Sequence, residues 1–154
     1  MDRLTEIFVT LSIVMIFLLP CLVVAILVLF TSGAPSLYWS QRMGRAGRPF
    51  LIPKFRTMML NTPVAPTENL DNPGQYITRL GNLLRRTSID EMPQLYSVLK
   101  GDMSLVGPRP VLTTQKEFLE RRRLAGIDSL RPRITGWAQI NGRDNVTTSD
   151  EIIL

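Results

Sequence analysis

An uninterrupted apolar run near the start of the chain constrains its fold more than any other feature. Twenty-four residues, from Ile7 to Phe30, carry no charge, and the next charged residue is Arg42. As a helix rising about 1.5 Å per residue, this run would reach about 36 Å, enough to cross the roughly 30 Å hydrocarbon core of a bilayer. It therefore predicts a membrane-inserted helix. A cleaved signal peptide fits poorly, because the run is longer than a usual signal core and no basic excess precedes it.

A proline almost midway through the run leaves two topologies open. Pro20 removes one backbone hydrogen bond and disfavours helical geometry at Leu19. The helix either spans the membrane with its N-terminus outside, or bends and leaves through the leaflet by which it entered. Basic residues crowd the C-terminal flank, and such a flank marks the cytoplasmic side; they are Arg42, Arg45, Arg48, Lys54 and Arg56. These features alone favour the span.

Composition limits the chemistry that the rest of the chain can perform. Among 154 residues there is no histidine, which excludes Ser-His-Asp and Cys-His catalysis and every histidine-ligated metal site. The single cysteine, Cys21, excludes an internal disulfide framework and a thiolate zinc cluster. Any catalysis must therefore use carboxylates, guanidinium groups, hydroxyls or a hard, oxygen-bound cation.

The net charge of +5 favours anionic partners such as phosphates or acidic lipids. We do not expect nucleic acid among them, because the basic run Arg121–Arg123 lacks interleaved aromatic residues and the chain shows no recognisable nucleic-acid-binding module.

Beyond residue 41 the pattern predicts a small α/β domain of short pieces. Two strands, at 36–41 and 50–55, flank the turn-forming residues 44–49 and form a hairpin. Residues 61–74 contain three prolines and predict an exposed loop. We accordingly expect a membrane-inserted helix and junction over residues 1–35 and a cytoplasmic domain over 36–154.

The helices of this domain are predicted from leucine spacing. Leucines recur at helical intervals near residues 80–84 and again near 95–99. Residues 113–125 predict a basic amphipathic helix with Phe118, Leu119 and Leu124 on its apolar side and Arg121–Arg123 mostly outside. Residues 134–140 predict a short strand or turn segment that contains Trp137.

The stretch that includes Asp90 and Glu91 is the most informative for chemistry. Ser88 followed by Glu91 matches a capping box, and Pro93 agrees with a helix that begins here, with either Ser88 or Asp90 as its N-cap. Both alternatives place Asp90 and Glu91 in the first turn, where the helix end stabilises carboxylates and binds phosphate. Acidic residues in a first turn more often only cap the helix.

Basic residues around these carboxylates make a role in phosphate chemistry more plausible than capping alone. Arg85 and Arg86 stand just upstream, and Arg109 lies between two prolines that stiffen its backbone, which suits a guanidinium holding a fixed pose on a phosphate. Lys54 and Arg56 should share one face of a strand. Taken singly, Arg109 also fits a solvated turn, and the strand cations also fit a membrane-facing basic edge.

Several runs together resemble the bacterial sugar transferases, the monotopic polyprenol-phosphate phosphoglycosyl transferases. They follow one another in the family's order and cover essentially the whole chain. The runs are GRPF at 47–50, KFRTM at 54–58, RTSIDEMPQL at 86–95, LKGDMSLVGPRP at 99–110, RP at 131–132 and ITGWAQINGR at 134–143.

The resemblance implies a mechanism and its residues. Members move a phosphosugar from a nucleotide (UDP) sugar to polyprenol (undecaprenyl) phosphate, which initiates assembly of exopolysaccharide, O-antigen, capsule or glycoprotein glycans. It implies that Asp90 attacks the β-phosphorus and carries the phosphosugar, while Glu91 holds Mg²⁺, with Asp90 as the second ligand, or manages a proton. Arg85 and Arg109 correspond to phosphate-binding arginines, and Lys54 and Arg56 lie in the family's basic strand motif.

The resemblance also implies a re-entrant helix, with both ends on the cytoplasmic side of the bacterial inner membrane, which reverses the preference for a span. The family's helix breaks at a Ser-Pro pair, whereas this chain has Leu19 before Pro20. Arg133 replaces a usual glycine and Pro53 a frequent aromatic residue. Relatives continue beyond Leu154, so we expect the C-terminal part of the family domain to be missing; the alternative is an inactive member that acts as a membrane-bound partner.

Overall fold

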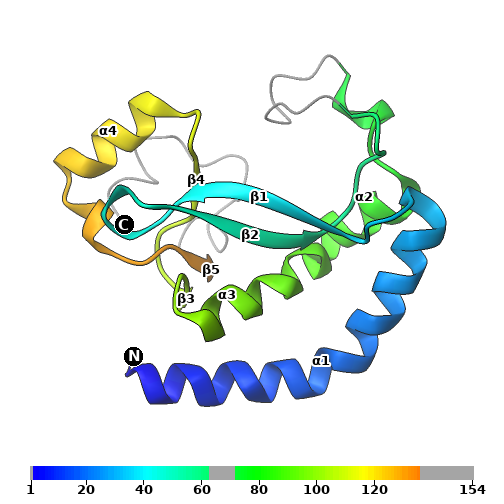
Figure 1. Cartoon of the computed structure of the whole chain (residues 1–154), viewed down its shortest axis with the longest axis horizontal. Helices are drawn as coiled ribbons and strands as arrows, with labels where there is room; N and C mark the ends of the chain where they lie inside the picture. Colours follow the sequence, from blue (N-terminus) through cyan, green and yellow to red (C-terminus); the bar gives the residue numbers. More distant parts are fainter. Residues whose placement is uncertain (1, 63–71, 136–154) are drawn as a thin grey trace. The chain divides into compact units, whose positions relative to one another are not determined.

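A computed structural model describes residues 2–62 and 72–135 of the chain. It contains a mixture of helices and short strands, as the sequence predicts (Figure 1). The elements in chain order are α1 (Arg3–Ser32), β1 (Leu37–Met43), η1 (Arg45–Gly47), β2 (Pro49–Phe55), η3 (Pro73–Gln75), α2 (Arg79–Thr87), η4 (Ile89–Gln94), α3 (Leu95–Lys100), β3 (Ser104–Val106), β4 (Val111–Leu112), α4 (Lys116–Leu124), η5 (Ile127–Ser129) and β5 (Arg133–Thr135).

The described residues form two compact units. The first unit comprises residues 2–14, 39–52 and 94–135, and the second comprises 15–38, 53–62 and 72–93. Helix α1 and the hairpin strands contribute residues to both units. These units do not correspond to the predicted division between a membrane-inserted segment (residues 1–35) and a cytoplasmic domain (residues 36–154). That division concerns position relative to the membrane and stays a prediction.

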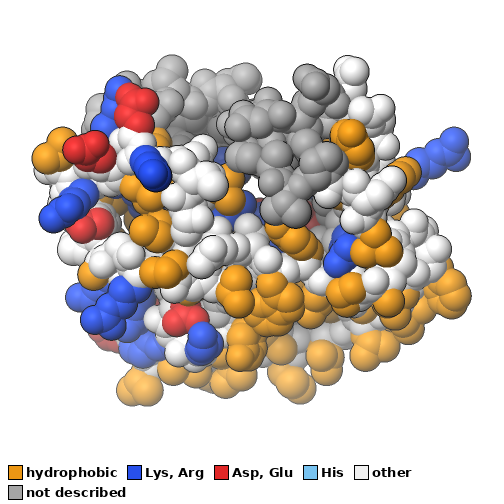
Figure 2. Space-filling model, turned by 45° about the horizontal axis from the view of Figure 1, so that its top comes forward, with side chains coloured by type: hydrophobic (Ala, Val, Ile, Leu, Met, Phe, Trp, Pro, Cys, Tyr) orange, Lys and Arg blue, Asp and Glu red, His pale blue; other side chains and the backbone are white. Residues whose placement is uncertain are grey.

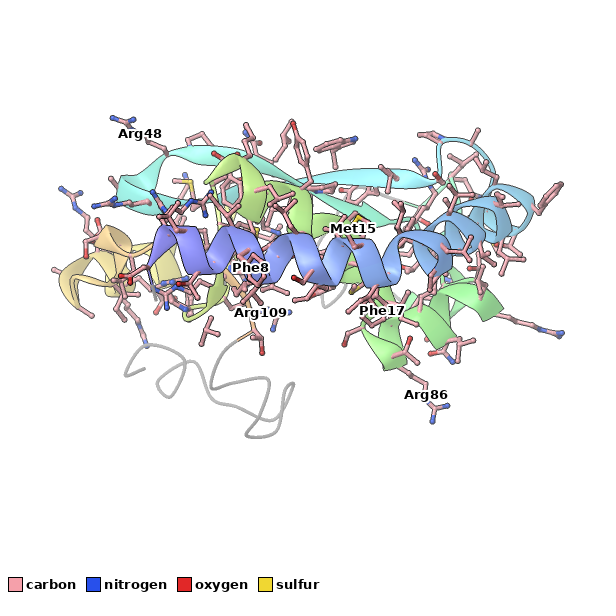
Figure 3. The ribbon with its side chains drawn as sticks, turned by 90° about the horizontal axis from the view of Figure 1, so that it is seen from below. Phe8, Met15, Phe17, Arg48, Arg86 and Arg109 are labelled. Carbon is pink, nitrogen blue, oxygen red and sulfur yellow. The ribbon has the colours of Figure 1, made fainter. Side chains whose placement is uncertain are left out.

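Helix α1 is the one helix among the described residues that is long and apolar enough to cross a membrane. It stays helical through Pro20. Most of its large apolar side chains are exposed, including Phe8 at 72% and Met15 at 75%. Figure 3 views α1 with these side chains labelled, and Figure 2 shows how many hydrophobic side chains remain on the surface. A soluble helix would bury such a face, so the exposure agrees with an apolar surround.

The predicted hairpin is confirmed. Strands β1 and β2 are neighbours in a three-stranded sheet of order β2-β1-β4. The Gly44 amide donates to the Arg48 carbonyl at 2.8 Å and closes the turn. In the first unit β1 pairs antiparallel with β4, with Arg42 opposite Leu112. A second, parallel pair joins β3 and β5, with Ser104 opposite Arg133.

Each unit has its own small apolar core. In the first unit Ile52, Val98 and Met103 are fully buried together. In the second unit Val28 packs with Phe55 and Leu84, so the C-terminal part of α1 is anchored by burial of its inward side. The leucine spacing correctly predicts α2 and α3, because these inward residues recur at helical intervals.

One helix departs in part from its prediction. Helix α4 begins at Lys116 rather than at residue 113. Phe118 and Leu119 are partly buried and Arg121 and Arg123 are exposed, as predicted. Leu124, expected on the apolar side, is 84% exposed, and Arg122, in a run expected to lie mostly outside, is only 9% exposed. Its Nη1 donates to the Arg109 carbonyl at 2.7 Å, and its guanidinium lies 5.8 Å from the Phe118 ring centroid. The contacts of Arg122 therefore help to orient this short helix, in addition to its partly buried apolar residues. The predicted loop at 61–74 and the segment at 134–140, with Trp137, lie largely outside the described residues.

Helix α2 packs its backbone directly against the segment that follows β2. A Cβ on Gly81 would lie 2.0 Å from the Thr57 carbonyl oxygen, so only glycine fits. The Thr57 carbonyl accepts from the Thr78 amide at 3.0 Å, and the Thr78 hydroxyl accepts from the Gly81 amide at 2.9 Å, which caps the helix.

We predict that Gly81→Ala lowers the free energy of unfolding by about 2 kcal/mol or more, because backbone must move to admit the methyl group. Gly74→Ala is the matched control, since a Cβ there meets nothing within 4 Å. Thermal unfolding of the detergent-solubilised full chain measures both. Equal midpoints for the two variants would contradict the close packing of α2.

Candidate functional site

The two carboxylates predicted to carry the chemistry lie side by side in η4. The chain leaves α2 through Ser88, whose left-handed backbone (φ 58°) ends that helix. Residues Ile89–Gln94 then form a 3-10 helix with Asp90 and Glu91 in its first turn. The predicted position in a first turn is confirmed, although this turn is 3-10 rather than α. Asp90 is buried, with 8% of its surface exposed.

Lys54 joins this pair from β2. Its Nζ lies 2.6 Å from Oε1 of Glu91, and both side chains are partly buried. The strand thus holds a cation against the second carboxylate, and the Lys54 charge also acts on Asp90. Partial burial makes this pair stronger than a fully exposed ion pair, because less water screens it.

Arg85 reaches the same place from the last turn of α2. Its Nε donates to the Thr57 hydroxyl at 2.9 Å, which fixes the guanidinium. Burial lowers the pKa of Arg85, and the negative charge of Asp90 partly offsets this effect. Thr57 is a residue that sequence reasoning missed, although it stands directly after Arg56 in the basic strand motif.

The environment of Asp90 moves its pKa above the ordinary value of 3.8. Burial is the main cause, because it disfavours the charged carboxylate, and the neighbouring Glu91 acts in the same direction. The positive charges of Lys54 and Arg85 oppose the rise. A carboxylate held this way is poorly hydrated yet electrostatically able to approach a phosphate, which suits a nucleophile.

The remaining predicted residues, Arg56 and Arg109, make other contacts within their own units. The Nε of Arg56 donates to the Pro35 carbonyl at 3.0 Å, whereas Lys54 binds Glu91, so the two strand cations have different contacts. Arg109 is an exposed residue of the first unit, and its carbonyl accepts from Arg122. The structure thus brings Lys54, Arg85, Asp90 and Glu91 together in the second unit.

No group of three or more histidine, cysteine or carboxylate side chains that could hold a metal occurs within the described residues 2–62 and 72–135. Asp90 and Glu91 are adjacent carboxylates, and one or two carboxylates suffice for Mg²⁺ when a substrate diphosphate supplies further oxygens. The donor set therefore fits Mg²⁺ that binds together with a diphosphate.

Comparison with known proteins identifies related chains. The galactosyl transferase CpsE of Streptococcus agalactiae serotype III (strain NEM316) is 41% identical over 155 residues, covering 88% of this chain and 33% of that protein. The uncharacterized sugar transferase EpsL of Bacillus subtilis (strain 168) is 41% identical over 145 residues, covering 86% of this chain and 66% of that protein.

A UDP-glucose:undecaprenyl-phosphate glucose-1-phosphate transferase of Caulobacter vibrioides is 38% identical, covering 86% of this chain and 50% of that protein. The chain thus spans between a third and two thirds of the length of these relatives. The sequence model of the family described as bacterial sugar transferase matches residues 1–154. The chain belongs to the bacterial sugar transferase family.

Proposed function

We propose that this chain transfers a phosphosugar from a UDP-sugar to undecaprenyl phosphate through an aspartyl-phosphosugar on Asp90. The observation that carries the proposal is the buried Asp90 carboxylate with Lys54, Arg85 and Glu91 around it. Relatives are named as undecaprenyl-phosphate sugar phosphotransferases, which supports the same reaction class. The product would begin assembly of a glycan on a lipid carrier.

The reaction proceeds in two displacements. An oxygen of Asp90 attacks the β-phosphorus of the UDP-sugar, the bond from that phosphorus to the bridging oxygen breaks, and uridine monophosphate leaves with the electron pair. A phosphate oxygen of undecaprenyl phosphate then attacks the same phosphorus and restores the Asp90 carboxylate. Two steps through a covalent intermediate replace one difficult transfer.

The neighbouring cations lower the repulsion between Asp90 and the diphosphate. Arg85, fixed by Thr57, offers a planar donor group to phosphate oxygens, and Lys54 adds a point charge. From the family resemblance, we assign Arg109 a further contact with substrate phosphate. Arg56 belongs to the same basic strand motif as Lys54. Asp90 and Glu91 would hold Mg²⁺, which when bound neutralises charge that develops on the diphosphate.

We predict that Asp90→Asn abolishes both protein labelling and release of uridine monophosphate. Membranes containing the full chain are incubated with a panel of UDP-sugars labelled at the β-phosphate, without lipid acceptor. Loss of the nucleophile should reduce both signals by about 10²-fold or more. Glu91→Gln should lower turnover while some labelling persists.

Asp102→Asn is the matched control, because Asp102 is a carboxylate already paired with a lysine, Lys100, at 2.7 Å. Release of uridine monophosphate by Asp90→Asn at the wild-type rate would refute Asp90 as nucleophile. Absence of labelling in the wild-type chain would instead favour the inactive, membrane-bound partner.

The raised pKa of Asp90 generates a second prediction. Because only the carboxylate attacks, labelling should fall as the pH drops through a value above 3.8. Lys54→Met removes a charge that lowers this pKa, so the acid limb of the pH profile should move to higher pH. Lys100→Met, which removes another ion-paired lysine, should leave the limb in place. A limb that does not move in Lys54→Met would show that Lys54 does not act on Asp90.

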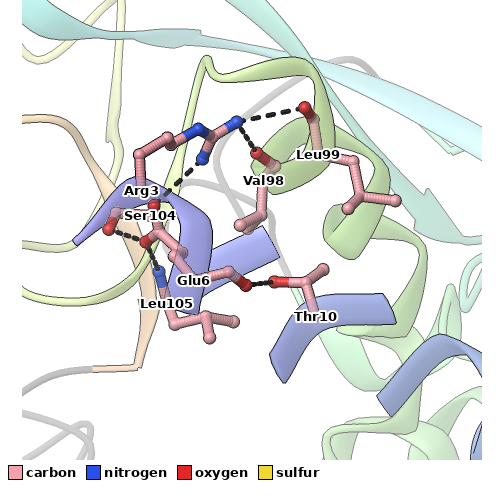
Figure 4. A network of polar contacts seen from close by, with 7 residues as sticks. All are labelled: Arg3, Glu6, Thr10, Val98, Leu99, Ser104 and Leu105. Atoms are coloured by element: carbon pink, nitrogen blue, oxygen red, sulfur yellow. Dashed lines mark hydrogen bonds and ion pairs between the residues drawn. The ribbon is translucent and has the colours of Figure 1, made fainter. Parts of the chain in front are cut away.

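We also propose that α1 is re-entrant, with both ends on the cytoplasmic face. Polar contacts at its beginning support this topology. Within the first unit the buried Glu6 accepts from the Ser104 hydroxyl and, at 2.9 Å, from the Leu105 amide (Figure 4). Arg3 pairs with Glu6 at 2.9 Å and donates to the Val98 carbonyl at 2.7 Å.

The other end of α1 packs within the second unit. Val28 is fully buried against Phe55 and Leu84, and the Ser32 and Thr78 hydroxyls lie 3.4 Å apart. The residues that bind the two ends, near 55–84 and 98–105, belong to one polar stretch with no second candidate span among its described residues. These contacts support the proposal that both ends of α1 lie on one side of the bilayer.

We predict that a cysteine introduced at Asp2, in a Cys21→Ser background, is not labelled by a membrane-impermeant thiol reagent added outside intact cells. Thr114→Cys in the same background is the control, since Thr114 is exposed within the polar domain. Pro20→Leu should favour a straight helix and increase outside labelling at position 2. Labelling of position 2 from outside in the protein that keeps Pro20 would overturn the re-entrant topology.

A further inference from the structure

The first unit contains a basic hollow that the proposed reaction does not use. Its volume is about 250 Å³, and four arginines line it: Arg3, Arg45, Arg131 and Arg133. Glu6 is the one carboxylate among the described lining residues. Ser104, Leu105 and Arg3 bind that carboxylate, and one carboxylate among four arginines leaves the lining with a net positive charge.

The guanidinium groups of Arg45, Arg131 and Arg133 line the hollow. Among the residues that the structure describes, none accepts a hydrogen bond from the side chain of Arg45, Arg131 or Arg133. The Nε of Arg133 is moreover buried with no partner. Buried donors in proteins almost always have an acceptor, and clustered arginines repel one another unless an anion lies between them.

The backbone holds Arg133 in this position. Its amide donates to the Pro108 carbonyl at 3.0 Å, and β5 pairs with β3. The side chain crosses directly over Gly107, where a Cβ would lie 2.3 Å from the Arg133 Cδ. Gly107 has a φ of +140° and no side chain, so it provides the space that this arginine fills.

The location of the hollow identifies the class of anion. Arg3 and Glu6, which line it, immediately precede the apolar run that starts at Ile7. Leu4 and Phe8 next to them are 82% and 72% exposed. Apolar side chains that enter the acyl region beside arginines place those arginines at the depth of lipid headgroups.

We propose that this hollow binds the phosphate group of an anionic membrane lipid, which unlike a zwitterionic lipid carries no cation of its own beside the phosphate, with Arg45, Arg131 and Arg133 as its donors. Guanidinium groups match phosphate oxygens in shape and charge, and the N–H of Arg133 gains its acceptor. The site anchors the first unit where α1 enters the leaflet. A free phosphate has the same chemistry, so the test separates the two sources.

The experiment measures thermal unfolding of the full chain in micelles of a nonionic detergent. Phosphatidic acid, phosphatidylcholine or inorganic phosphate is added in separate titrations. A ligand that binds the folded state raises the unfolding midpoint by mass action. We expect phosphatidic acid to raise it at low mole fraction, and neither phosphatidylcholine nor inorganic phosphate to do so over the same range.

Variants test the residues. Arg133→Gln and Arg45→Gln should each require about tenfold more phosphatidic acid for half of the shift, as expected for loss of a hydrogen bond to a charged group. Arg48→Gln is the matched control, because Arg48 lies in the same turn as Arg45 and is not among the residues that line the hollow. Figure 3 labels Arg48. It should titrate as the wild type does.

Three results would overturn the proposal. They are the absence of any shift with phosphatidic acid in the wild type, an equal shift with inorganic phosphate, and an equal loss in Arg48→Gln. The measurement needs no UDP-sugar, so its outcome is independent of whether Asp90 forms a covalent intermediate.

Discussion

A carboxylate buried at the start of an apolar helix is the constraint on which the proposed membrane placement of this chain depends. Removing Glu6 from water is costly unless every oxygen finds a partner, and Ser104, Leu105 and Arg3 supply those partners. The same Arg3 caps the carbonyls at the end of α3. The helix therefore cannot carry its first turn through hydrocarbon without leaving several polar groups unpaired, and this cost favours entry and exit through one leaflet.

In the candidate site, a close contact between two backbone segments positions one of the charges that act on Asp90. Gly81 lets α2 lie against Thr57, and Thr57 in turn binds the Nε of Arg85. The guanidinium is then held near Asp90, whose burial would otherwise make ionisation unfavourable. The absence of a side chain at Gly81 thus contributes, through Thr57 and Arg85, to the charged state of Asp90, alongside the larger effects of burial and of Lys54.

The sequence predicts those parts of the fold that depend on local chemistry. Turn residues at 44–49 indicate the hairpin, leucine spacing indicates α2 and α3, and the first-turn position of Asp90 and Glu91 follows from their neighbours. Long-range polar contacts are not visible in this way. The orientation of α4 depends on Arg122 reaching the Arg109 carbonyl, and no periodicity in residues 113–125 encodes that contact.

The same limit applies to the site residues. Lys54 is recognisable as a cation on a strand, but its partner Glu91 is 37 positions away, and sequence alone does not distinguish this pairing from that of Arg56 with the Pro35 carbonyl. The Arg3–Glu6 pair stands just before the apolar run, where charges are common, so the sequence does not reveal that Glu6 is buried. The resemblance to a family identifies which carboxylate matters, whereas only the structure explains its environment.

The contact between Gly107 and Arg133 has a consequence for how this chain can change over generations. The arginine occupies the volume that any side chain at position 107 would need. Replacement of Gly107 would therefore displace Arg133, whereas replacement of Arg133 by a smaller residue leaves Gly107 undisturbed. A side chain at position 107 is therefore compatible with a smaller residue at position 133 but not with this arginine in its present position, so the two positions constrain each other.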